Sequence, residues 1–219
     1  KGFFVSWQSG SQQIAVIFAA LLGLLLNHLL AKEAVTEWGW RIPFVVGCMI
    51  VPFLFWVRRM LEETEAFSQR KQHPTMRQIM RSLASSWALV LAGMLMVVTT
   101  TVMFYMITAF TPTFGKTVLM MSDKESFLVT LCVGVSNLIW LPLMGALSDR
   151  IGRRPLLITF TLLMIVTTWP VLHWLVGAPT FAHLMEAELW LSFLYASYNG
   201  AMVVYLAEIM PAEVRASGF

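Results

Sequence analysis

The chain has 219 residues, of which 58% are hydrophobic and 12% are charged, and its formal net charge is +3. Soluble domains usually contain about twice this share of charged residues, so the composition argues against a soluble protein. The basic residues lie between apolar stretches, so we expect no nucleic-acid partner. Cys48 and Cys132 both fall in apolar stretches and have no disulfide or metal-site spacing, so we also expect no metal and no cofactor.

Six apolar stretches are candidates to cross a membrane, which takes about 20 residues of helix. The sequence therefore predicts an all-α membrane protein with six transmembrane helices. The second stretch is short, and the glutamines Gln8, Gln12 and Gln13 weaken the first. The stretches are residues 3–30, 42–57, 87–110, 127–147, 156–176 and 189–210.

The lysines and arginines divide unevenly between the two sets of helix ends. One set holds four of the 15, and the other holds eleven. Because basic residues favour the cytoplasmic side, we expect the eleven-rich side and both chain ends to be cytoplasmic. The four are Lys32, Arg41, Lys116 and Lys124.

Residues 58–86 form the longest polar segment and carry charges of both signs. We interpret this segment as a cytoplasmic linker. Met76, Ile79, Met80 and Leu83 recur at helical spacing, which favours an amphipathic helix on the membrane surface over a plain flexible connection.

A charged turn interrupts the apolar pattern after the fourth stretch. It reads Gly145-x-x-x-Asp149-Arg150-x-Gly152-Arg153-Arg154, and three arginines in five residues place it outside lipid. The turn resembles the signature loop of the major facilitator superfamily, in which the arginines hold a cytoplasmic gate. The resemblance implies that Gly145, Asp149, Arg150, Gly152, Arg153 and Arg154 act as a gating motif.

Flanking motifs resemble the metabolite:proton symporter branch of the same family. They are Trp38-Gly39-Trp40-Arg41-Ile42-Pro43-Phe44, the run that starts at Arg58-Arg59, and Glu208-Ile-Met-Pro211. The resemblance implies helices five to ten of a twelve-helix fold. Residues 1–57 are then the last two helices of the N-terminal bundle, residues 58–86 the linker, and residues 87–219 the first four helices of the C-terminal bundle. We expect Asp149 to face Lys1-Gly2-Phe3, and the missing helices of the same polypeptide to be partners.

Four further motifs are similar to the citrate–proton symporter group of that branch. They are the run Ser6 to Gln13, the run Thr99 to Tyr105, the run Gly134 to Pro142, and Tyr198-Asn199-Gly200-Ala201-Met202. This similarity implies uptake of citrate, or of a related tricarboxylate such as tricarballylate, together with protons. The expected surroundings are lipid and a bacterial inner membrane.

Polar side chains within the apolar stretches are the candidate substrate ligands, because polar groups are costly in a membrane. Each can hydrogen-bond a carboxylate without carrying charge. The alternative is that they join helices to one another. For the threonines we expect bonds within their own helix, at Thr99, Thr100, Thr101 and Thr108. The candidates are Gln8, Gln12, Tyr105, Asn137, Tyr198 and Asn199.

None of the six stretches carries a charged residue near its centre, and Glu186 and Glu188 lie near an outer end. A tricarboxylate needs cationic partners in a site of low polarity. We therefore expect the cationic ligands and the proton-carrying acid on helices outside this chain.

Three alternatives stay open. The same fold can carry another solute, such as a dicarboxylate, a shikimate-like acid, proline or betaine. A membrane enzyme or receptor is disfavoured, because no nucleophile–base pair or carboxylate cluster is visible, so we expect no enzymatic activity. A six-helix channel or assembly partner is the third.

Overall fold

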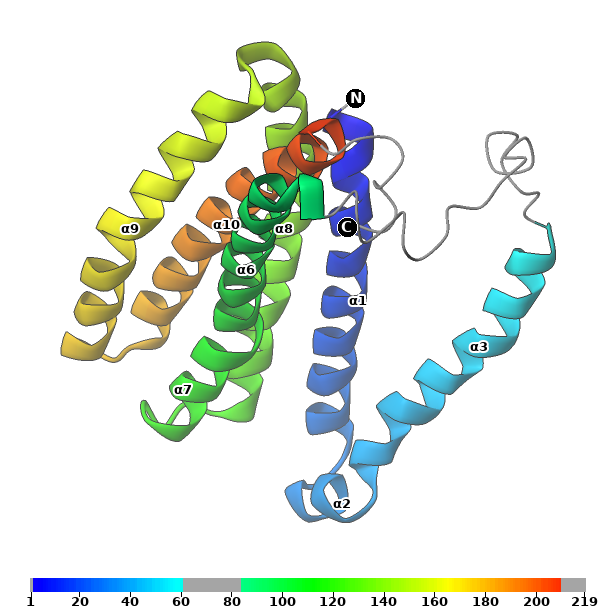
Figure 1. Ribbon diagram of the computed structural model, residues 1–219. Coiled ribbons are helices and arrows are strands. Elements are labelled where there is room, and N and C mark those ends of the chain that lie inside the picture. Colours follow the sequence, from blue (N-terminus) through cyan, green and yellow to red (C-terminus); the bar gives the residue numbers. More distant parts are fainter. Residues whose placement is uncertain (1, 61–83, 210–219) are drawn as a thin grey trace.

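In a computed structural model, which describes residues 2–60 and 84–209, the chain forms long helices joined by short turns (Figure 1). Six described helical segments are long and apolar enough to cross a membrane, which confirms the six predicted spans. The long helices are α1 (Gly2–Leu29), α3 (Ile42–Met60), α6 (Trp87–Tyr105), α8 (Asp123–Ile151), α9 (Arg153–Gly177) and α10 (Phe181–Ile209). The short ones are α2 (Lys32–Glu37), the 3₁₀-helix η1 (Gly39–Arg41), the π-helix η2 (Met106–Phe110) and α7 (Thr111–Thr117). The predicted amphipathic helix lies outside the described residues.

Local chemistry sets the bounds of α8. At its start, the Ser122 backbone N–H donates to Glu125 Oε2 at 2.8 Å, and the Glu125 N–H donates to Ser122 Oγ at 3.3 Å. This reciprocal capping satisfies two backbone donors that a helix start leaves unpaired. At its end, Gly152 has a φ of 94°, a conformation that favours glycine. The turn therefore reverses the chain directly into α9.

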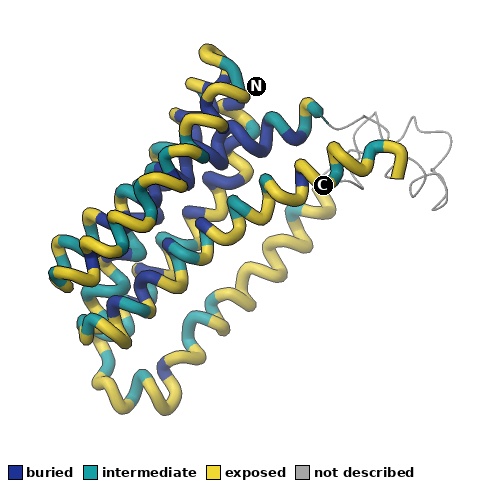
Figure 2. The backbone as a smooth tube through the Cα atoms, turned by 60° about the vertical axis from the view of Figure 1, so that its left-hand side comes forward, coloured by how far each residue is buried: buried dark blue, intermediate teal, exposed yellow. Residues whose placement is uncertain are grey.

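Helix α10 begins at Phe181, although the sequence predicted a start near Leu189. The reason is that His183, Glu186 and Glu188 interrupt the apolar pattern on which the prediction rested. Most of α10 is buried between α1, α6, α8 and α9 (Figure 2). The structure thus brings a carboxylate into the interior of the helix bundle.

Helices α1 and α8 pack antiparallel along their whole length. Gly145 lies against Ser6 at one end of the pair, Gly134 against Ile17 near the middle, and Phe127 against Gly23 at the other end. Small residues at helix contacts let the backbones approach closely, as is typical of membrane helices. Helix α8 thereby joins α1 to α10.

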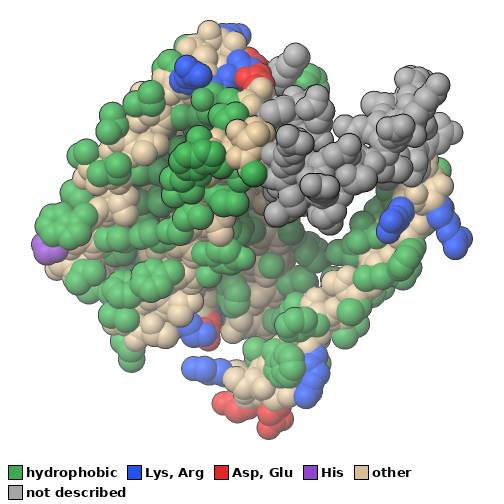
Figure 3. All heavy atoms as spheres, viewed as in Figure 1, with side chains coloured by type: hydrophobic (Ala, Val, Ile, Leu, Met, Phe, Trp, Pro, Cys, Tyr) green, Lys and Arg blue, Asp and Glu red, His purple; other side chains and the backbone are tan. Residues whose placement is uncertain are grey.

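Helix α3 stands apart from the other helices, and none of its residues is buried (Figure 1). Over the whole molecule, apolar side chains cover the middle of the face seen in Figure 3, whereas charged side chains gather toward the two ends of the molecule. Such an extended apolar surface fits lipid or further helices rather than water. The chain is an integral membrane protein.

Candidate functional site

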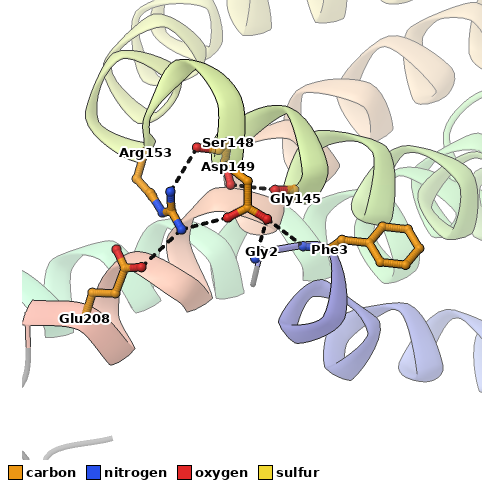
Figure 4. A network of polar contacts seen from close by, with 7 residues as sticks. All are labelled: Gly2, Phe3, Gly145, Ser148, Asp149, Arg153 and Glu208. Atoms are coloured by element: carbon orange, nitrogen blue, oxygen red, sulfur yellow. Dashed lines mark hydrogen bonds and ion pairs between the residues drawn. The ribbon is translucent and has the colours of Figure 1, made fainter.

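The charged turn after α8 forms a polar cluster, which we call the gate cluster: Gly145, Ser148, Asp149, Arg153 and Glu208 (Figure 4). Arg153 Nη2 lies 2.7 Å from Asp149 Oδ1 and 3.1 Å from Glu208 Oε1. Arg153 Nη1 also donates to the Ser148 carbonyl at 3.3 Å. One arginine of α9 therefore holds the end of α8 to the end of α10.

Asp149 also binds the first turn of α1. The backbone N–H of Gly2 donates to Asp149 Oδ2 at 2.7 Å, and that of Phe3 does so at 3.4 Å (Figure 4). A carboxylate at a helix start satisfies unpaired N–H groups and matches the positive end of the helix dipole. The structure thus places Asp149 where the sequence predicted it, at the start of α1.

Gly145 allows the closest approach of α1 to α8. A Cβ atom added at Gly145 comes within 2.6 Å of Ser6 Oγ and 2.8 Å of the Gly2 carbonyl oxygen. Such contacts are too short for any side chain, so α1 must move away if residue 145 is larger than glycine.

We expect Gly145→Ala to lower the free energy of unfolding by about 1–3 kcal/mol, the usual cost of overpacking a tight contact. Thermal unfolding of the detergent-solubilised protein measures this. Gly177→Ala is the matched control, because nothing lies within 4 Å of a Cβ added there. Equal unfolding midpoints for the two variants contradict the tight contact.

The two other arginines of the motif are exposed and make looser contacts. The Arg154 guanidinium lies 6.0 Å from the centre of the Tyr205 ring, while Arg150 is exposed at the end of α8. Neither of them joins Arg153 in its ion pairs with Asp149 and Glu208. Arg153 is therefore the arginine that links the helices in this arrangement.

A second polar cluster is buried where α1, α8 and α10 meet; it consists of Gln13, Asn137 and Ser192, and we call it the Asn137 group. Asn137 Nδ2 donates to Gln13 Oε1 at 3.2 Å, and Ser192 Oγ donates to Asn137 Oδ1 at 2.9 Å. The side chains of Gln13, Asn137 and Ser192 are all fully buried. The structure brings predicted Asn137 into contact with Gln13 and Ser192, which the sequence analysis did not select. The sequence analysis selected Gln8 and Gln12 of the same helix instead.

Two predicted residues of α10 lie further along the same helix. Asn199 Nδ2 donates to the Tyr195 hydroxyl at 3.2 Å, and both side chains are buried. Tyr198 points toward α6, with its hydroxyl 3.5 Å from the Met96 carbonyl oxygen. The structure therefore separates Tyr198 from Asn137 and Asn199.

Three predicted candidates are exposed: Gln8, Gln12 and Tyr105. The described part of the chain does not bring them to the Asn137 group. By contrast, Thr99, Thr101 and Thr108 donate to backbone carbonyls four residues earlier at 2.6–3.0 Å, which confirms their predicted local bonds. The prediction is wrong for Thr100, whose hydroxyl has no hydrogen-bond partner among the described residues.

A basic cavity of about 400 Å³ lies at the opposite end of α8 from the gate cluster. Three lysines line it, and Lys116 forms an ion pair with Asp123. The cavity carries more positive than negative charge, so it favours anions. Its lysines are Lys32, Lys116 and Lys124.

Glu188 is a further polar residue that the sequence analysis did not select. Among the buried side chains of residues 2–60 and 84–209, it is the only carboxylate, and none is a lysine, arginine or histidine. The only feature of the sequence that could have pointed to Glu188 is its position one helical turn before Ser192, which the structure places beside Asn137.

Comparisons with known proteins show the family to which the chain belongs. The sequence profile of the Major Facilitator Superfamily matches residues 1–219. The chain is 55% identical to the citrate-proton symporter of Salmonella typhi over all its residues, and 56% identical to that of Klebsiella pneumoniae. It is 34% identical to the alpha-ketoglutarate permease of Escherichia coli (strain K12).

The chain spans only about half the length of these curated relatives: 50%, 49% and 50%, respectively. No solved structure matches it significantly. The profile match over the whole sequence, together with six apolar helices and a gate cluster built on the signature turn, shows that the chain belongs to the Major Facilitator Superfamily.

Proposed function

We propose that these residues form part of a symporter that takes up citrate, or a related tricarboxylate, together with protons by alternating access. The observation that carries the proposal is the identity of 55–56% to two citrate–proton symporters over the whole chain. Identity falls to 34% for a relative named for another organic acid and to 26% for one named for proline and betaine.

The gate cluster supports alternating access. It joins α1 to α8, α9 and α10 at one end of the bundle through a few ion pairs and hydrogen bonds. Such contacts can break and reform as one bundle rocks against the other. We place this end of the bundle on the cytoplasmic side of a bacterial inner membrane, because basic residues are in excess at this end. The structure then corresponds to a cytoplasm-closed arrangement.

The basic cavity supports an anionic solute. With the gate cluster in the cytoplasm, Lys32, Lys116 and Lys124 surround a cavity on the outer side. A cavity lined by positive charge raises the local concentration of an anion before it enters. Citrate carries up to three negative charges and fits this field better than zwitterionic proline or betaine.

The substrate site combines buried amides with groups from the rest of the transporter. In this proposal Asn137 and Asn199 bind the solute within the bundle, and Tyr198 joins them after a rotation of α10. The exposed side chains Gln8, Gln12 and Tyr105 face the remaining helices of the same polypeptide. The cationic ligands come from those helices, because the described spans bury no lysine or arginine.

Competition for uptake tests the solute. We expect unlabelled citrate and tricarballylate to block uptake of radiolabelled citrate by the whole transporter in vesicles. 2-Oxoglutarate should block it more weakly, and betaine should not block it. Block by betaine, or the absence of citrate uptake under a proton gradient, contradicts the proposed function and favours another solute on the same fold.

A further inference from the structure

Glu188 stands two turns inside α10 and is fully buried, at 0% exposure. Neither of its carboxyl oxygens has a hydrogen-bond partner among the described residues. Buried polar groups in proteins are nearly always paired, so an unpaired carboxyl group needs an explanation. Two residues away, Glu186 is exposed and faces the surface.

The group beside Glu188 is the hydroxyl of Thr111 at the start of α7. This hydroxyl is buried and donates its proton to the Met106 carbonyl at 2.9 Å. A threonine hydroxyl has one proton and two acceptor positions. With its proton directed to Met106, this hydroxyl does not donate to Glu188, and both Glu188 oxygens stay unpaired among the described residues.

The surroundings offer no charge to balance a carboxylate. Within the described residues, no charged side chain acts on the Glu188 carboxyl group. An unpaired buried carboxylate costs several kcal/mol, so the neutral acid is the stable form here. The other ionisable groups on the neighbouring helices either have other partners or are exposed. Those with other partners are Lys116 with Asp123, Glu125 with Ser122, His183 with the Ala178 carbonyl, Asp149 and Glu208 with Arg153, Arg154 over Tyr205, and Tyr195 with Asn199. The exposed ones are His28, Tyr105, Lys124, Arg150, His173 and Glu186.

A cavity lies close to the same segment of chain. It has a volume of about 480 Å³ and is lined by residues of α1, η2, α7 and α8, including Thr108, Pro112 and Thr113. Thr111, within this segment, is instead buried beside Glu188. The segment includes a π-helix, a feature often found at functional sites. Residues 108–113 therefore border both the cavity and the surroundings of Glu188.

Glu188 is also connected to the candidate substrate site. Ser192 lies one helical turn further along α10 and donates to Asn137 Oδ1 at 2.9 Å. Residues 188, 192, 195 and 199 fall on one face of α10 and are all buried. A change at the Asn137 group can therefore reach Glu188 through a single turn of helix.

We propose that Glu188 is a proton-carrying group of this transporter, holding its proton in the arrangement described here. When η2 and α7 move, Glu188 takes this proton from water in the cavity, which lies on the outer side. After the bundles rock, the carboxyl group releases the proton to water on the cytoplasmic side and is left as a carboxylate, so the proton moves inward with the solute. This inference rests on the proposed function, because coupling needs a transported solute.

Glu188→Gln tests the proposal, since glutamine has the shape of the protonated acid but cannot release a proton. We expect the whole transporter with this change to exchange internal for external citrate at a rate comparable to the unchanged protein. Under an inward proton gradient, its internal citrate should rise no higher than the external concentration. Glu186→Gln, two residues away on the exposed face, is the matched control and should retain both activities.

Proton-driven accumulation by Glu188→Gln overturns the proposal, and so does loss of exchange in a correctly folded Glu188→Gln protein. Failure of citrate exchange in the unchanged transporter contradicts the proposed function instead. An infrared spectrum decides the proton state without any solute: a band of a protonated carboxyl group should be present in the unchanged protein and in Glu186→Gln, and absent in Glu188→Gln. If Glu188→Gln does not fold, Thr111→Val replaces it, because loss of the neighbouring hydroxyl changes the surroundings of the carboxyl group and must shift that band. An unshifted band contradicts the proposal.

Discussion

Replacing Asp149 by alanine is expected to slow citrate uptake by the whole transporter at least tenfold. At this end of the bundle Asp149 links α1 to α9, since its carboxylate binds the Gly2 N–H and the Arg153 guanidinium at 2.7 Å each. A helix cap contributes about 1 kcal/mol, and a partly exposed ion pair up to about 1 kcal/mol. Together they shift the equilibrium of the gate by roughly thirtyfold, since 1.4 kcal/mol is a factor of about ten.

Glu208→Gln provides a graded control for this prediction. It removes the longer of the two ion pairs of Arg153, at 3.1 Å, and leaves the contact between Asp149 and α1 intact. We therefore expect a smaller loss of initial uptake rate than for Asp149→Ala. Equal losses in the two variants would mean that the cap on α1 contributes nothing to the gate.

Removing the amide of Asn137 is expected to raise the citrate concentration needed for half-maximal uptake by roughly tenfold or more. In the proposed site the Asn137 amide hydrogen-bonds the solute, and Asn137→Ala leaves a buried oxygen of the solute without that partner. A buried group left without a partner costs about 1–3 kcal/mol, and 1.4 kcal/mol is about tenfold in affinity. The same change removes the bonds of Asn137 to Gln13 and Ser192, which lowers stability. The same rise is expected for Asn199→Ala if both amides bind the solute.

The kinetic constants separate binding from mere stability. If Asn137 only joins helices, Asn137→Ala lowers the unfolding temperature while the half-saturating citrate concentration stays unchanged. Thr101→Val is the control for loss of a hydrogen bond, because Thr101 donates only to the Val97 carbonyl of its own helix. Unchanged citrate affinity in both asparagine variants contradicts the substrate-site assignment.

The spans and the gating turn were predictable because each depends on local sequence. Apolar length predicts a membrane helix, and the spacing of Gly145, Asp149 and Arg153 is a local motif. The position of Asp149 at the start of α1 followed from the family resemblance, and the structure places it there.

The buried polar groups were less predictable, because packing between helices decides which face of a helix is covered. Gln12 and Gln13 are equally polar, yet only Gln13 faces α8. Glu188 looked like part of a polar helix end, and its charge moved the predicted start of α10 to Leu189. Only the packing of α10 against η2 and α8 shows that Glu188 is buried.

The most direct test of proton-coupled citrate uptake uses the whole transporter in sealed vesicles with radiolabelled citrate at equal concentrations inside and outside. When the outside is made acidic, we expect internal citrate to rise transiently above its equilibrium value. A protonophore should abolish this rise. Citrate that only equilibrates under the proton gradient, or that accumulates equally with the protonophore present, contradicts the account.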